Sequence, residues 1–144
     1  MRHGKQRDGV VQIGNIVDQW IDENTSMIVA PVGFLVESLD ARITILPGFR
    51  WDGASVPRFF WRVIGAPRNG KYVPAALLHD ALYAAELFSR LQCDRVFLDY
   101  MEQLGVSWWR RNAMYLAVRV GGGFVWRKHT SKSVAKSREL VLVN

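Results

Sequence analysis

The chain has 144 residues, 49% of them hydrophobic and 22% charged, and this balance excludes a chain that is disordered throughout. The single cysteine, Cys93, excludes an internal disulfide, and no apolar run reaches the roughly 18 residues of a membrane-spanning helix. The formal net charge is +6, and five of the cations lie in residues 127–138, which contain no acid. We expect one soluble domain over residues 1–144 that buries its own core.

The N-terminal third predicts β-structure. Residues 1–8 are polar and predict a flexible arm, whereas residues 9–47 form the β part. Apolar and polar residues alternate in Phe34–Leu39 and again in Arg42–Leu46, with a hairpin corner at Asp40-Ala41. A small antiparallel sheet is the expected result.

Residues 48–73 predict a long structured loop, because glycines and prolines recur through it. Within it, Arg58–Ile64 is expected to form one short helix. Asp52 and Ser55 have two interpretations, and both stay open. They cap backbone groups inside the loop, or their oxygens point into a site formed by the following helices.

Residues 74–120 predict three helices. The first starts at Pro74 and reaches about Phe88, and Ser89 with Gln92 forms a capping box for the second. The second ends at Gly105, and the third begins after Ser107. We expect Gly121-Gly122-Gly123 to end the third helix near Val120, followed by short strands at Phe124–Trp126 and Glu139–Val143. The fold class is α+β: an N-terminal antiparallel sheet, a long loop and three packed helices.

The first two of these helices carry a candidate site. His79 and Tyr83 lie one helical turn apart, with Asp80 beside them, and Asp94 is expected to face His79 from the second helix. An imidazole held by a carboxylate is what general-base chemistry or a metal site needs. A competing interpretation pairs Asp94 with Arg90, four residues earlier on the same helix. The neighbouring Cys93 is interpreted as a small core residue rather than a soft metal ligand.

The basic segment, residues 127–138, has a structural and a functional interpretation. It is a solvated, partly disordered end, or it binds phosphate backbones, anionic lipid or a neighbouring subunit instead of packing on its own core. Candidate partner-binding residues are the cations Arg127, Lys128 and Lys132, together with Trp61 in the loop.

Between Phe49 and Trp126, the motifs Asp52-Gly53-Ala54-Ser55-Val56-Pro57 and His79-Asp80 with Leu82-Tyr83 support a resemblance. The chain resembles an uncharacterised domain family found widely in tailed bacteriophages and prophages. That resemblance implies a virion component made in the host cytoplasm, without an established activity, whose partners are other tail proteins in an oligomeric particle. The matching residues are Gly48-Phe49, Asp52-Gly53-Ala54-Ser55-Val56-Pro57, Ala76–Asp80, Leu82-Tyr83, Ser89-Arg90, Asp94, Phe97, Met101, Tyr115, Val118-Arg119, Gly121 and Trp126.

The helix pair also resembles that of secreted and viral phospholipases of the A-two type. The resemblance implies that His79 activates water, Asp80 holds a divalent cation and Asp94 orients the imidazole with Tyr83. The chain departs from that pattern, because it has no disulfide frame and no calcium loop of the usual form. The implied cofactor is one calcium or zinc ion, with Asp80, His79 and Asp52 as candidate ligands.

Two functions of different classes follow. The first is a structural component of a phage tail or baseplate, in which the His/Asp cluster is a polar or metal-bound knot. The second is a small hydrolase, phospholipase-like or acting on the cell wall, that attacks the host envelope with His79 as base. Nucleic-acid binding through residues 127–138 is a third candidate, supported by charge alone.

Overall fold

The computed structural model describes residues 9–52, 62 and 70–144. Within these residues, strands dominate the N-terminal part and helices the remainder, so the predicted α+β class is confirmed. The strands are β1 (Val10–Ile13), β2 (Asp18–Trp20), β3 (Ser26–Ile28), β4 (Val32–Val36), β5 (Ala41–Ile45), β6 (Arg50–Trp51) and β7 (Val141–Val143). The helices are α2 (Val73–Ala85), α3 (Arg90–Gln103), α4 (Trp108–Arg127) and α5 (Ser131–Leu140).

The strands form two antiparallel sheets. One has four strands in the order β1-β4-β5-β7, and the other has three in the order β2-β3-β6. Between β4 and β5, the one-turn helix η2 (Glu37–Leu39) is followed by Asp40 in the left-handed conformation, with φ 50°. The predicted hairpin corner is therefore present, although β4 ends at Val36 rather than at Leu39.

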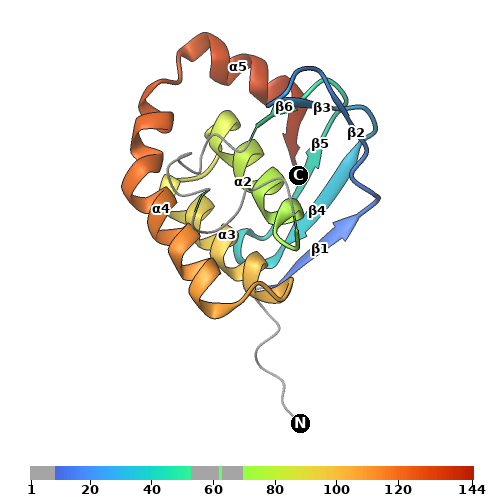
Figure 1. The fold of residues 1–144 in the computed structure, drawn as a ribbon. Helices are drawn as coiled ribbons and strands as arrows, with labels where there is room; N and C mark the ends of the chain where they lie inside the picture. Colours follow the sequence, from blue (N-terminus) through green and yellow to red (C-terminus); the bar gives the residue numbers. More distant parts are fainter. Residues whose placement is uncertain (1–8, 53–61, 63–69) are drawn as a thin grey trace.

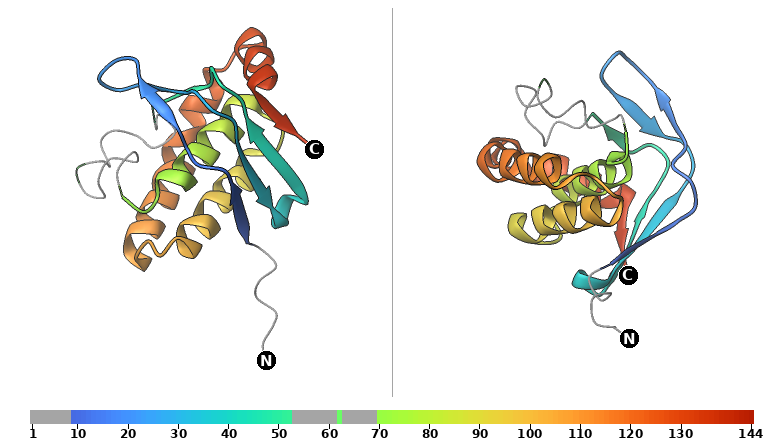
Figure 2. Two further views of the ribbon diagram at one scale, coloured as in Figure 1. Left: turned by 90° about the vertical axis from the view of Figure 1, so that its right-hand side faces the viewer. Right: turned by 60° about the horizontal axis from the view of Figure 1, so that its bottom comes forward.

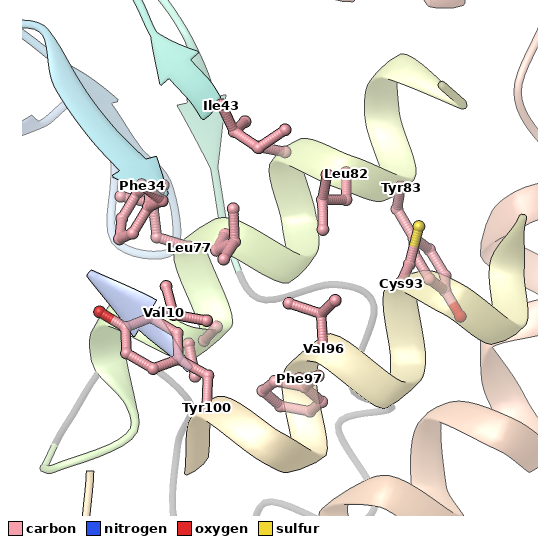
Figure 3. Packing of buried hydrophobic residues seen from close by; sticks show 14 of the residues in the cluster. Val10, Phe34, Ile43, Leu77, Leu82, Tyr83, Cys93, Val96, Phe97 and Tyr100 are labelled. Carbon is pink, nitrogen blue, oxygen red and sulfur yellow. The ribbon is translucent and has the colours of Figure 1, made fainter. Parts of the chain in front are cut away.

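The core lies between the four-stranded sheet and the helix pair α2–α3 (Figure 3). Phe34 and Ile43 face each other across β4 and β5, and both side chains are fully buried. Leu77 and Leu82 bring α2 onto this surface, and Phe97 brings α3. Helix α4 packs on α3 and lies farthest from the sheet (Figures 1 and 2). This stacking leaves one side of α4 directed away from the core.

Helix α4 corrects the sequence prediction at its C-terminal end. The helix does not stop near Val120 but continues through Gly121–Gly123 to Arg127, so the strand expected at Phe124–Trp126 is helical. Three glycines cost an isolated helix roughly 3 kcal/mol relative to alanine. Close packing against α2 and α3, which is described below, explains why Gly122 is accommodated.

Most of the basic segment is exposed, as predicted for a solvated end, but it is helical rather than partly disordered. Residues 131–140 form α5, which packs against α2, and the chain then enters the four-stranded sheet as β7. Arg138 donates hydrogen bonds to the carbonyl oxygens of Ala85 (2.7 Å) and Glu86 (3.0 Å) at the end of α2. A strand was correctly expected within Glu139–Val143, and it occupies Val141–Val143.

Candidate functional site

Helix α2 places His79 and Tyr83 on one face. Proline at the start of the helix and alanines along it favour this element, and a spacing of four residues stacks the two rings. Their centroids are 4.3 Å apart. The other side of the His79 ring stacks on Phe97 of α3, at 4.5 Å and an interplanar angle of 26°. The imidazole is therefore held between two aromatic rings, and its side chain is only 1% exposed.

Helix α3 brings Asp94 to this face. Ser89 and Gln92 form the predicted capping box, which fixes where α3 begins. His79 Nε2 lies 2.7 Å from Asp94 Oδ1, and the Tyr83 hydroxyl donates to the same oxygen at 2.7 Å. The predicted pairing of His79 with Asp94 across the two helices is confirmed.

Two arginines complete the arrangement from the other side. Arg119 of α4 donates from Nη1 to Asp94 Oδ2 at 2.7 Å, and Arg90 Nη1 lies 3.5 Å from the same oxygen. Both interpretations of Asp94 thus hold at once, because it meets His79 and Arg90 together. Arg90 also donates to the carbonyl oxygens of Val118 (2.9 Å) and Arg119 (3.2 Å), which ties α3 to α4. We call His79, Tyr83, Arg90, Asp94 and Arg119 the polar cluster.

The polar cluster favours an ionised carboxylate. Burial by itself raises the pKa of Asp94, but the hydrogen bonds from His79, Tyr83 and Arg119 more than offset it, and the pKa lies below its usual value. An ionised carboxylate only accepts hydrogen bonds, so His79 Nε2 carries a hydrogen and donates it. Burial, together with the hydrogen bond to Asp94, raises the pKa of Tyr83, which remains a phenol.

The cluster also fills the acceptor positions of Asp94. A carboxylate offers about four lone-pair sites, and four donor groups approach its two oxygens. Asp94 is fully buried, with 0% of its surface exposed. Such an arrangement joins three helices through one carboxylate.

Arg119 is the member that sequence reasoning missed as a site residue. A cation in the middle of an apolar helix was the available signal, because a buried or half-buried charge needs a partner. Its side chain is 31% exposed and reaches from α4 to the buried carboxylate. Such a partner had to come from an acid on one of the other helices, and Asp94 of α3 is that acid.

The predicted metal ligands divide between two places. Asp52 and Asp80 line a pocket of about 140 Å³ together with Tyr83 and His129, whereas His79 is not among the described residues that line it. Neighbouring positions on a helix diverge by about 100°, which separates Asp80 from His79. Within residues 9–52, 62 and 70–144, no group of three or more His, Cys, Asp or Glu side chains is placed to hold a metal ion. Calcium or zinc binding stays a prediction.

The remaining predicted residues lie elsewhere or outside the described residues. Ser55, Trp61 and, apart from Arg62, the short helix expected at Arg58–Ile64 fall outside the described residues. Lys128 and Lys132 are exposed. Arg127 is exposed too and lies over the ring of Phe124, with its Cζ atom 5.2 Å from the ring centroid.

A second contact between helices was not predicted. His129 Nδ1, in the turn between α4 and α5, lies 2.7 Å from Glu86 Oε2 at the end of α2. Glu86 has a positive φ of 48° and terminates α2. This contact lies at the surface edge of the helical layer, and it fixes the turn that leads into α5.

The described part of the chain contains no helix long and apolar enough to cross a bilayer. The curated protein described as "Uncharacterized protein y4jT", from Sinorhizobium fredii (strain NBRC 101917 / NGR234), is 44% identical over 77 residues. This match covers 52% of the chain but only 22% of that protein, so the chain corresponds to a minor part of its relative. No solved structure matches the chain. Residues 26–118, which include β3 to β6, α2, α3 and the first half of α4, match a family model, and the chain therefore belongs to the family described as "Protein of unknown function (DUF1353)".

Proposed function

We propose that this domain is a structural component of a bacteriophage particle, of the tail or baseplate, and that the polar cluster holds its helices together. One observation carries the non-catalytic part of this proposal: His79 is buried between Tyr83 and Phe97 and donates to a carboxylate whose acceptor positions are filled. A general base must reach its substrate, directly or through one water. A buried, saturated cluster is better suited to fixing the geometry of three helices.

The particle itself is proposed from the resemblance to the phage-associated domain family. Under this proposal the protein is located in the virion and contacts other tail proteins in an oligomeric assembly. The exposed cations Arg127, Lys128 and Lys132 are available to acidic neighbours. Nucleic acid is a further possible ligand for the same cations, because phosphate contacts require only accessible positive charge.

A metal-assisted hydrolase that attacks the host envelope is the second candidate, and the pocket beside the polar cluster favours it. Asp52 and Asp80 supply carboxylate oxygens there, and Tyr83 lines the pocket while its hydroxyl reaches Asp94. For His79 to act as base, however, α2 and α3 would have to separate enough to admit water and substrate. This requirement makes the hydrolase the weaker of the two proposals.

Replacement of His79 distinguishes the two functions. If His79 is structural, His79→Ala leaves a cavity and removes a donor from Asp94, so the free energy of unfolding should fall by roughly 2–4 kcal/mol. His129→Ala is the comparison variant, because that imidazole also pairs with a carboxylate, that of Glu86, but is partly exposed, so its loss should cost less than that of His79. Urea unfolding monitored by circular dichroism measures both values.

The same preparations test for catalysis. We expect no calcium-dependent release of fatty acid from phospholipid vesicles by the unmodified protein. Calcium-dependent lipolysis that disappears in a well-folded His79→Ala variant would refute the structural proposal and establish the enzyme.

A further inference from the structure

Helix α4 carries an apolar stripe in which four exposed large side chains alternate with the partly buried Ala113 and Gly123. We call Trp109, Ala113, Leu116, Val120, Gly123 and Phe124 the α4 seam. Its four large side chains, those of Trp109, Leu116, Val120 and Phe124, are 49–69% exposed. The opposite face of α4 is buried against the domain through Met114, Ala117, Val118 and Gly122.

The α4 seam differs from ordinary surface exposure. Single exposed apolar residues are common on soluble proteins and need no explanation. Here the residues follow one line on the outer helix of the fold, and from Trp109 to Phe124 that line extends for roughly 22 Å at 1.5 Å per residue. Figure 2 shows α4 as the helix farthest from the strands, with its outer side away from them. A line of this kind is the surface through which a helix packs on another protein element.

The spacing favours another helix as the partner. Positions 109, 113, 116, 120 and 123 are separated by alternating steps of four and three residues, which is the spacing of a helix–helix seam. Large side chains alternate along this line with the small Ala113 and Gly123, a pattern that suits the packing of two helices. A facing helix with the same spacing can insert its own side chains between those of α4.

The charges of α4 indicate the chemistry of the partner. Arg110 lies over Trp109, with Cζ 5.3 Å from the ring centroid, and Arg127 lies over Phe124. The two arginines thus border the α4 seam near its ends, and residues 108–127 contain no Asp or Glu. A second copy of α4 would bring further arginines against these without a compensating acid. Asp or Glu side chains on a partner would instead be attracted to this positive charge.

We propose that the α4 seam binds an amphipathic helix of a partner protein, with apolar residues toward the seam and Asp or Glu on its flanks. This inference rests on the proposed function as an assembly component, and it names the kind of neighbour that such a component takes. The contact is made by residues separate from the polar cluster.

A designed peptide tests the proposal on the full-length chain. The probe is a fluorescein-labelled helix of three heptads, with Leu and Ile on one face and Glu on the flanks, titrated by fluorescence anisotropy. Leu116→Glu places a charge in the centre of the α4 seam and should weaken binding by about tenfold or more. Leu91→Glu is the matched control, because Leu91 is an exposed leucine of α3 outside the seam. This variant should bind the peptide as tightly as the unmodified chain does.

Three further measurements distinguish an acidic helix from the other possible occupants of the α4 seam. The same peptide with Lys in place of Glu should bind at least about tenfold more weakly, and Arg127→Glu should reduce this preference. The proposal is overturned if neither peptide binds. It is also overturned if the unmodified chain dimerises through Leu116 in light scattering, or if phosphatidylglycerol vesicles bind the seam while the acidic peptide does not. Fatty-acid release by the unmodified chain, by contrast, would refute the proposed function and leave the peptide result standing.

Discussion

The backbone of Gly122 in α4 lies directly against the hydroxyl of Tyr83 in α2. A Cβ atom at position 122 would be 2.5 Å from Tyr83 Oη and 3.1 Å from Arg90 Nη1. These two atoms belong to the polar cluster, so the absence of a side chain at Gly122 allows the cluster to pack beneath α4. Trp126, one turn further along α4, packs against Tyr83 in a T-shaped arrangement, with the two ring centroids 5.2 Å apart.

Replacement of Gly122 by alanine should therefore destabilise the domain. The added methyl group displaces Tyr83 or Arg90 from Asp94, and overpacking of this kind costs about 1–3 kcal/mol. Gly123→Ala is the matched control, because the nearest atom to its Cβ would be the Nη2 atom of Arg127 at 3.9 Å. That variant should be about 1 kcal/mol more stable than the unmodified chain, since alanine favours a helix. Equal effects of the two substitutions in urea unfolding would contradict this role of Gly122.

The stability of the domain should decrease in acid through Asp94. Its pKa in the folded chain lies below the value of 3.8 expected when unfolded, so the unfolded chain binds a proton more readily. The contribution of Asp94 is complete above about pH 4 and is lost as the pH falls through the folded pKa. Asp94→Asn should cost about 2–4 kcal/mol at neutral pH and flatten the acid limb of the stability curve. The free energy of unfolding of both proteins is measured by urea unfolding between neutral and acid pH. If it falls with pH to the same extent in both, Asp94 is not the titrating group.

Arg138 should stabilise the end of α2. Its guanidinium donates to the carbonyl oxygens of Ala85 and Glu86, and hydrogen bonds from charged donors contribute about 1–2 kcal/mol each when partly buried. Arg138→Ala should lower the free energy of unfolding by about 1 kcal/mol or more. Lys136→Ala removes an exposed cation from the same helix and should change it by less than about 0.5 kcal/mol. Similar losses in the two variants would indicate a general effect of charge.

Cys93 should be inert in the native protein. The side chain is completely buried, and burial raises the pKa of its thiol to about 12. Only the thiolate reacts rapidly with disulfide reagents, so modification requires the chain to open. We expect a thiol reagent such as dithionitrobenzoate to react at once in denaturant and very slowly with the folded chain. Immediate stoichiometric reaction at neutral pH would show that Cys93 is accessible.

The sequence predicts well those features that depend on neighbouring residues. The capping box at Ser89 fixed the start of α3, and helical spacing then placed Asp94 opposite His79. The continuation of α4 through Gly122 depends instead on residues distant in sequence. Glycine disfavours a helix locally, but Tyr83 and Arg90 pack so close to position 122 that only glycine fits there. Arg119 was unassigned for the same reason: its partner lies on another helix. The composition of α5 is polar and most of its residues are exposed, as expected, but its order depends on packing against α2, which its own sequence does not indicate.

Strand β7 joins β5 across about 100 residues of intervening chain, and helices α2 to α5 all lie between them. The four-stranded sheet consequently cannot be completed during early synthesis, and until β7 arrives the edge of β5 has unpaired backbone groups. Pairings this distant in sequence slow folding, because the chain must close a large loop before it gains the contacts. During that interval β5 can pair with a strand of another molecule. We therefore expect the pairing of β7 with β5 to set how soon a newly made chain is protected from aggregation.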